Sequence, residues 1–218
     1  MYRMAKSIVS KKKEGKNPII AEIKVFSPKH GDLLRGRNEI DILRIYEKAG
    51  VVGISYITDK RYFRGDFSVF KKICASTDLP VLRKDFITSK EEIERTAEAE
   101  GSAILLIGRL LKEKTSEFVD YALEHELDTL VEVHSREEME IAKETNTTMI
   151  GINNRDISKL ERDDGNVSLT EKLSKYLPKG VVSVSESGIS TLEDLKVALK
   201  YTDAVLIGTS FMRAEDTL

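Results

Sequence analysis

Short apolar runs alternate with longer amphipathic stretches along the whole chain. Consecutive runs begin about 20 to 33 residues apart, which is the spacing expected when a helix connects two parallel strands. The pattern therefore predicts eight parallel strands. They begin near Ile19, Val52, Val81, Ala103, Thr129, Met149, Val181 and Ala204.

The stretches between the runs have the periodicity of amphipathic helices. Three of them begin with a pair that can form a capping box, in which a hydroxyl and a carboxylate three residues later satisfy the first backbone N–H groups. These pairs are Ser89–Glu92, Ser135–Glu138 and a weaker variant, Thr191–Asp194. The predicted helices cover residues 39–49, 67–75, 89–100, 111–125, 135–145, 168–176 and 190–200.

Several of the apolar runs end on a charged or amide residue. One such residue is ordinary, but the same feature repeated from strand to strand is typical of a (βα)8 TIM barrel, whose active site lies at the carboxyl ends of the strands. The fold class predicted is therefore α/β, with a single barrel. The polar residues that end the runs are Glu22, Lys24, Lys84, Glu132, Asn153 and Glu186.

The pleat of a strand decides which of these side chains face the barrel interior. Because side chains alternate, Glu22 and Lys24 share one face, and Glu132 shares a face with His134. An unpaired ion in such an interior costs on the order of several kcal/mol even after relaxation. A structural ion-pair network is the ordinary alternative, but the common location at one end of the strands favours a chemical role.

Two short segments predict a phosphate site. Ser187-Gly188-Ile189 follows the seventh strand and Gly208-Thr209-Ser210 follows the eighth. Barrels of this class hold phosphate in the loops after these two strands, where small residues let backbone N–H groups approach an anion. We expect a side chain added at Gly208 to occupy space that the phosphate needs.

The two ends of the chain depart from a regular barrel. No low-complexity linker or change in composition divides residues 1–218, so we expect one domain. We expect residues 1–18 to form an extra helix, which covers either the bottom of the barrel or its entrance. Too few residues follow the eighth strand for a full helix, so either the final helix is truncated or a partner subunit covers that flank.

The composition limits which kinds of partner and which cellular location we expect for the protein. The net charge of −2 gives no electrostatic case for nucleic acid. No apolar stretch near the amino terminus has the length of a signal peptide or membrane span, and the single cysteine, Cys74, can form no intramolecular disulfide. These features favour a cytoplasmic location. His30, His125 and His134 share no metal-ligand spacing, so we expect no metal site.

The ordered motifs resemble those of indole-3-glycerol phosphate synthase of tryptophan biosynthesis. The resemblance extends from about Ile19 to Arg213. It implies a lyase that needs no cofactor and converts 1-(2-carboxyphenylamino)-1-deoxyribulose 5-phosphate into indole-3-glycerol phosphate, with loss of carbon dioxide and water. The motifs are Ala21-Glu22-Ile23-Lys24 with Ser27-Pro28, Lys84-Asp85-Phe86, Glu132-Val133-His134, Gly151-Ile152-Asn153-Asn154-Arg155-Asp156, Ser185-Glu186-Ser187-Gly188-Ile189 and Ile207-Gly208-Thr209-Ser210.

The resemblance also implies a role for each matching residue. Lys84 matches the principal general acid and Glu132 the general base. The polar shell around the reacting carbon chain is implied at Glu22, Lys24, Asn153 and Glu186. Phosphate binding is implied at Ser27, Ser187, Gly188, Gly208, Thr209 and Ser210. Arg155 matches a supporting arginine. The wall against the aromatic ring is implied at Phe63, Phe86, Leu106 and Ile157.

Two other functions remain open from the residues. A class I aldolase would use Lys84 or Lys24 as a Schiff-base nucleophile beside a carboxylate. A non-catalytic sugar-phosphate-binding barrel would need the phosphate loops, but it has no use for two interior lysines and three interior carboxylates. A homo-oligomer is compatible with the sequence.

Overall fold

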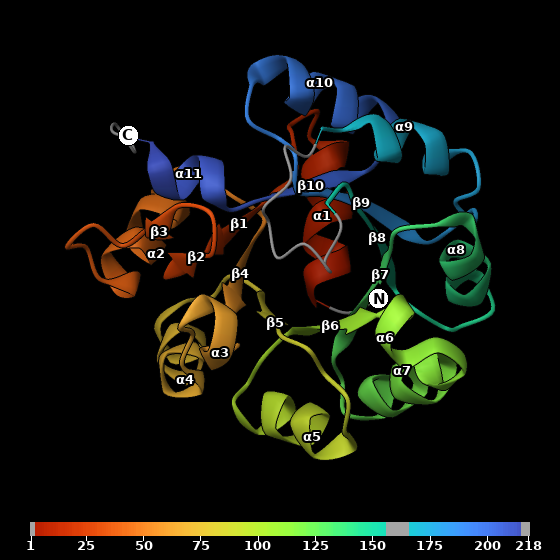
Figure 1. Ribbon diagram of the computed structural model, residues 1–218, viewed down its shortest axis with the longest axis horizontal. Helices are drawn as coiled ribbons and strands as arrows, with labels where there is room; N and C mark the ends of the chain where they lie inside the picture. The colour runs from red at the N-terminus through yellow and green to blue at the C-terminus, as the bar shows by residue number, and fades with distance from the viewer. Residues whose placement is uncertain (1–2, 156–165, 215–218) are drawn as a thin grey trace.

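The computed structural model describes residues 3–155 and 166–214. Its strands close into a parallel barrel in the order β1-β10-β9-β8-β7-β6-β5-β4 (Figure 1). All eight predicted strands are present, and the α/β barrel is confirmed. The barrel strands are β1 (Ile19–Ile23), β4 (Gly53–Ile57), β5 (Val81–Lys84), β6 (Ala103–Ile107), β7 (Asp128–Val133), β8 (Met149–Asn153), β9 (Val182–Glu186) and β10 (Ala204–Ile207).

Helices surround the barrel on its outside (Figure 1). The predicted helices are confirmed, and the helix after β10 is a five-residue stub, α11. The helix predicted over 111–125 is divided, because Lys112 has a φ of 52° that interrupts regular α-helix. The surrounding helices are α2 (Glu39–Lys48), α4 (Phe67–Ser76), α5 (Lys90–Glu98), α7 (Thr115–Glu124), α8 (Arg136–Lys143), α9 (Ser168–Ser174), α10 (Leu192–Tyr201) and α11 (Thr209–Arg213).

Shorter elements lie in the loops after three of the strands. A two-stranded antiparallel hairpin follows β1, and one-turn helices follow β4 and β6. These elements are β2 (Phe26–Ser27), β3 (Gly31–Asp32), α3 (Lys60–Phe63), α6 (Gly108–Leu111) and the 3-10 turn η1 (Lys112–Lys114).

Only one of the predicted capping boxes forms completely. It is the weaker variant at Thr191–Asp194, where both reciprocal hydrogen bonds are present. Ser135 accepts the N–H of Glu138, but the carboxylate of Glu138 accepts from other donors, so half of that box is present. The box predicted at Ser89–Glu92 was wrong, because Ser89 makes no capping bond and Glu92 pairs with Arg83 instead.

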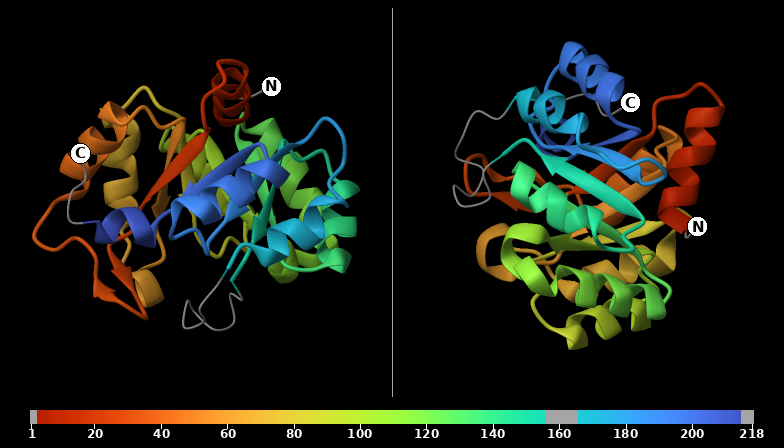
Figure 2. Two further views of the ribbon diagram at one scale, coloured as in Figure 1. Left: turned by 90° about the horizontal axis from the view of Figure 1, so that it is seen from above. Right: turned by 90° about the vertical axis from the view of Figure 1, so that its right-hand side faces the viewer.

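The amino-terminal helix α1 (Arg3–Lys13) covers the bottom of the barrel. Met4 and Ile8 are fully buried and pack against the interior layer of the barrel. Oδ2 of Asp128, at the start of β7, accepts the N–H groups of Met4 (2.7 Å) and Ala5 (3.1 Å). Figure 2 shows α1 at the opposite end of the barrel from the β2–β3 hairpin. The structure therefore decides between the two predicted positions of the extension.

Candidate active site

A cavity opens at the carboxyl ends of the strands, and its volume is about 880 Å³ with its open mouth included. Most of the residues predicted for a site meet here. The predicted residues that line it are Glu22, Lys24, Phe63, Lys84, Phe86, Glu132, Asn153, Arg155, Ser187, Gly188, Gly208, Thr209 and Ser210.

A cluster of buried charges forms the floor of the cavity. Nζ of Lys24 lies 3.1 Å from Oε1 of Glu22. Nζ of Lys84 lies 3.6 Å from Oε2 of Glu22 and 3.0 Å from Oε2 of Glu186. With Glu132 the cluster has three carboxylates and two ammonium groups. This imbalance favours one extra proton within the cluster, because an unpaired buried charge is costly.

Burial and the neighbouring charges together raise the pKa values of both Lys84 and Glu186. Burial by itself lowers the pKa of Lys84, but the carboxylates of Glu186, Glu22 and Glu132 outweigh burial and raise it above the ordinary value. Burial raises the pKa of Glu186 to about 7, against the opposing effect of Lys84. Lys84 is therefore an ammonium at neutral pH, and Glu186 can hold the extra proton of the cluster.

Glu186 lies behind the cavity wall. It therefore does not line the space in which the carbon chain of a substrate would react. It is 0% exposed and is not among the lining residues. Its carboxylate packs over Gly151 on the neighbouring strand, where an added Cβ would lie 2.0 Å from Oε1 of Glu186. Glu186 therefore reaches the cavity through Lys84, and Gly151 provides the space for it.

Glu132 faces the cavity from β7 and is fixed from one side. Its Oε2 accepts a hydrogen bond of 3.0 Å from Nδ2 of Asn153 on β8. The Oδ1 atom of Asn153 in turn accepts the N–H of Arg155, at 3.1 Å. The amide of Asn153 therefore orients the carboxylate and the start of the following loop.

The loops after β9 and β10 form one wall of the cavity. Ser187 and Gly188 have successive positive φ angles of 64° and 71°, which bend the chain sharply at the end of β9. Ser210 Oγ donates to the carbonyl of Ile189 at 2.7 Å and joins the two loops. At the start of α11 the first N–H groups have no partner within the helix. Together these features make the wall suited to an anion.

The sequence predicts that position 208 is a glycine because a phosphate needs the space, but the structure gives a different reason. A Cβ at this position would lie 2.3 Å from Oε1 of Glu22. The missing side chain therefore leaves room for a carboxylate of the charged cluster, as well as a free approach to the loop. Because Oε1 of Glu22 also holds Lys24, a side chain at Gly208 would disturb the cluster itself.

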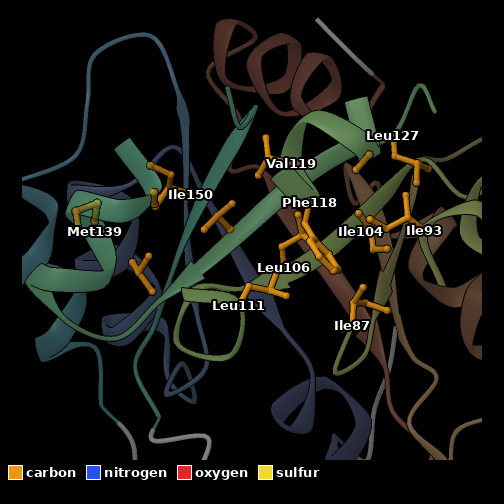
Figure 3. Close-up of a cluster of buried hydrophobic side chains, with 14 of the residues drawn as sticks. Ile87, Ile93, Ile104, Leu106, Leu111, Phe118, Val119, Leu127, Met139 and Ile150 are labelled. Carbon is orange, nitrogen blue, oxygen red and sulfur yellow. The ribbon is translucent and has the colours of Figure 1, made fainter. Parts of the chain in front are cut away.

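Besides Glu186, three predicted residues do not line the cavity or lie outside the described residues. Ser27 is buried in β2, where its Oγ accepts the N–H of Lys29 at 3.3 Å, and it does not line the cavity. Leu106 faces outward from β6 and packs near Phe118 of α7, as Figure 3 shows. Leu106 is therefore not part of the cavity wall, whereas the phosphate-binding role of Ser27 stays a prediction. Ile157 lies outside the described residues.

The face of β6 could not be chosen from its sequence, because all five of its residues are apolar. The register pairs Leu105 with Leu130 inside the barrel and Leu106 with Val131 outside it. A shift of one residue exchanges the two faces of a strand. The cavity residues that the sequence reasoning missed are Ile57, Asp59, Asp85, Leu105, Ile107, Ile189, Leu206 and Ile207.

Asp85 is held at the rim by neighbours that point away from the barrel axis. Its Oδ2 accepts from the hydroxyl of Thr58, and it lies 3.2 Å from Nη2 of the buried Arg83.

Within residues 3–155 and 166–214, no three His, Cys, Asp or Glu side chains are grouped as a metal site would require. No described helix is both long enough and apolar enough to cross a bilayer.

Comparison with known proteins identifies the family. The family model described as indole-3-glycerol phosphate synthase matches residues 2–218. The chain belongs to the indole-3-glycerol phosphate synthase family. The family prediction and the enzyme class, a carboxy-lyase of tryptophan biosynthesis, are confirmed.

Named relatives of this family are similar over nearly the whole chain. The indole-3-glycerol phosphate synthase of Pyrococcus abyssi is 72% identical over 201 residues, which are 92% of this chain and 88% of that protein. The enzyme of the same name from Thermococcus kodakarensis is 68% identical over 94% of this chain and 90% of its own. That from Methanocaldococcus jannaschii is 43% identical over 98% and 79%.

Solved structures with little sequence similarity share the fold. The tryptophan synthase α subunit of Legionella pneumophila superposes with a TM-score of 0.68 at 14% identity, covering 97% of this chain and 88% of that one. The N-acetylmannosamine-6-phosphate 2-epimerase of Clostridium perfringens gives 0.67 at 16% identity, covering 89% and 86%. At this identity the likeness concerns the barrel alone.

Proposed function

We propose that the cavity binds 1-(2-carboxyphenylamino)-1-deoxyribulose 5-phosphate and converts it to indole-3-glycerol phosphate, carbon dioxide and water. The loops that contain Gly188 and Gly208 hold the phosphate through backbone N–H groups. A hydrogen bond of 3.2 Å from Nζ of Lys24 to Oγ1 of Thr209 connects the charged floor with this loop wall.

The aromatic ring of the substrate lies against the apolar wall. Phe63 and Phe86 come from the loops after β4 and β5, and Leu105 and Ile107 come from the inner face of β6. The ring is thereby fixed on one side and the phosphate on the other. The ribulose chain between them spans the charged cluster, where reacting atoms can be held in a productive geometry.

Lys84 acts as the general acid in ring closure. The aromatic carbon attacks the ribulose carbonyl, and the carbonyl oxygen takes a proton as the bond forms. The raised pKa of Lys84 keeps its ammonium fully protonated before reaction. Loss of carbon dioxide then restores the aromatic ring. Lys24 and Arg155, which line the same cavity, offset the negative charge of the substrate carboxylate.

Glu132 acts as the general base in the loss of water. One group must donate a proton to the departing hydroxyl while another removes a proton from carbon. Glu132 is buried, faces the cavity and is oriented by Asn153, so its carboxylate has a fixed direction. The separate surroundings of Glu132 and Lys84 allow one to serve as base and the other as acid.

The observation that carries the proposal is the buried cluster of two lysines and three carboxylates beside the two loops that suit a phosphate. The test is fluorescence detection of indole-3-glycerol phosphate formed by the purified protein from the synthetic substrate. Sodium borohydride added during turnover distinguishes the aldolase alternative, because a Schiff base on Lys84 or Lys24 would be trapped covalently. Product without trapping supports the proposal, and trapping with no indole product contradicts it.

The proposed function extends to the partner, the domain organisation and the location of the protein. We propose that the partner is a small anionic molecule. We also propose that residues 1–218 form one domain and that the protein acts in the cytoplasm. Gel filtration at several protein concentrations would show whether the chain also forms a homo-oligomer.

A further inference from the structure

His134 lies directly behind the proposed base, and the mechanism above gives it no role. It follows β7 by one residue, and its side chain is 3% exposed. Nε2 of His134 lies 3.4 Å from Oε1 of Glu132, and Nδ1 lies 3.2 Å from Oε2 of Glu138 on α8. The imidazole therefore lies between two carboxylates, one of which faces the cavity and one of which does not.

The second carboxylate, Glu138, determines which ring nitrogen of His134 carries the proton. Burial raises the pKa of Glu138, but hydrogen bonds from His134 and Arg109 outweigh burial and lower it to about 2. Its Oε1 accepts from Nε of Arg109 at 2.9 Å, and its Oε2 accepts the backbone N–H of His134 at 2.7 Å. An ionised carboxylate only accepts hydrogen bonds, so Nδ1 of His134 must be the N–H donor.

In a neutral ring, the lone pair of Nε2 is then directed at Glu132, whereas a ring protonated on both nitrogens would donate to Glu132. A neutral imidazole has one donor and one acceptor nitrogen, and Nδ1 is already the donor. Neither Oε1 of Glu132 nor Nε2 of His134 has a hydrogen-bond partner among the described residues. Two acceptors cannot bond to each other. One added proton would turn this contact into a hydrogen bond, and buried polar atoms without partners are uncommon enough to require a reason.

We propose that His134 is neutral before the reaction and is a positioning residue that acts through Glu132. When Glu132 removes a proton from the substrate, that proton is held between Oε1 of Glu132 and Nε2 of His134. The substrate C–H bond breaks, an O–H bond forms, and its electron pair stays with the substrate as water leaves. Glu138 and Arg109 keep their charges throughout and hold the ring in place. The inference rests on the proposed function of Glu132.

The first test is a double-mutant cycle between His134 and Glu132. His134→Phe removes both ring nitrogens but keeps a planar ring, and we expect kcat to fall about 10-fold to 100-fold, as for other partners of active-site ligands. KM should change less than about threefold, because the phosphate loops and the apolar wall are intact. In the Glu132→Gln background, His134→Phe should cause no further loss, since no proton is taken up there.

The outcomes of the cycle separate this inference from the proposed function. Equal losses in kcat with and without Glu132→Gln would contradict the role of His134 but leave Glu132 as the base. A Glu132→Gln variant with the kcat of the parent would contradict the proposed function itself. Circular dichroism and thermal unfolding of each variant show whether it is folded.

A second measurement needs no substitution at His134. Nitrogen-15 NMR of the histidine rings in the parent protein should show His134 with a proton on Nδ1 and none on Nε2 at neutral pH. The variants His30→Asn and His125→Asn assign the other two signals. The opposite tautomer, or a ring protonated on both nitrogens, would overturn the proposal.

A third measurement changes the group that sets the tautomer. Glu138→Gln keeps an oxygen acceptor but removes the ionised carboxylate, so the proton of His134 is no longer fixed on Nδ1. We expect kcat to fall about 10-fold and its dependence on pH to change shape. The matched control is Glu140→Gln, an exposed position on the same helix that pairs with Lys143. Identical profiles for the parent and Glu138→Gln would contradict the proposal.

Discussion

The two ends of the barrel both bury carboxylates, but they stabilise them in different ways. At the bottom, one oxygen of Asp128 accepts two fixed backbone N–H groups at the start of α1. At the top, Glu22 and Glu186 pair with the side chains of Lys24 and Lys84, and Glu132 accepts from the side chain of Asn153. At both ends, each of these carboxylates has one buried oxygen that lacks a hydrogen-bond partner among the described residues. The bottom is held by backbone, whereas the top is held by groups that can exchange protons.

This difference explains what each end contributes. The backbone donors to Asp128 do not titrate, and their hydrogen bonds serve stability, although burial raises the pKa of the carboxylate itself. Side-chain acids and bases in a shared low-dielectric site have shifted pKa values, which is costly for stability but suited to catalysis. We therefore expect changes at the top to alter turnover more than folding, and changes at the bottom to do the reverse.

The largest effect is expected for Lys84→Ala at the top. Without the proposed general acid, turnover should fall by about two to four orders of magnitude, which corresponds to about 3 to 5 kcal/mol in the barrier. KM should change much less. Lys90→Ala, at an exposed lysine that pairs with Glu117, is the control and should keep the parent rate. Near-normal turnover of Lys84→Ala in steady-state assays would refute the assignment.

The next largest effect is expected for Ile8→Ala at the bottom. Ile8 is fully buried between α1 and the barrel interior, so the substitution leaves a cavity and should lower the free energy of unfolding by about 2 to 4 kcal/mol. Ile8→Val should cost about 1 kcal/mol. Denaturant unfolding measures both. Turnover per folded molecule should stay at the parent value, and a large loss of turnover would show that the two ends are coupled.

A third prediction concerns the pH dependence of stability at the top. The pKa of Glu186 rises from 4.5 to about 7 on folding, so the folded state binds more protons than the unfolded state between these values. The contribution of Glu186 to stability is therefore present below about pH 4.5 and is lost as the pH rises to about 7, by up to about 3 kcal/mol. Glu186→Gln should remove this loss.

The measurement for Glu186 is denaturant unfolding of the parent and Glu186→Gln at a series of pH values from 4 to 8. The difference in the free energy of unfolding between them should change across this range. A constant difference would mean that folding does not shift the pKa of Glu186.

The smallest effect is expected for Asp128→Asn at the bottom. The amide oxygen can still accept both N–H groups, because a single oxygen of Asp128 accepts both, but the side chain loses the charge that favours a helix amino terminus. We expect a loss of about 1 kcal/mol in the free energy of unfolding and no change in turnover. Asp120→Asn, which bonds only Asn146 at the surface, is the matched control. A loss of turnover without loss of stability would reverse the contrast between the two ends.

Much of the fold and the site could be predicted from local sequence alone. Strand positions follow from the apolar runs, and the polar residues that end these runs collect at one end because parallel strands share a direction. The predictions failed where local sequence carries no contrast. In β6 every residue is apolar, so nothing marked Leu105 rather than Leu106 as the inner residue. Ser27 was assigned from its motif, but it is buried in β2 and is not among the residues that line the cavity.

The sequence by itself determined the barrel, the set of charged groups and the family, because periodicity and motif order are local properties of the chain. Only the tertiary structure decided which end α1 covers, why Gly208 and Gly151 are small, and that His134 lies between Glu132 and Glu138. These features depend on distances between residues far apart in the chain or on the direction of individual side chains. Such distances are set by how the strands close into a barrel.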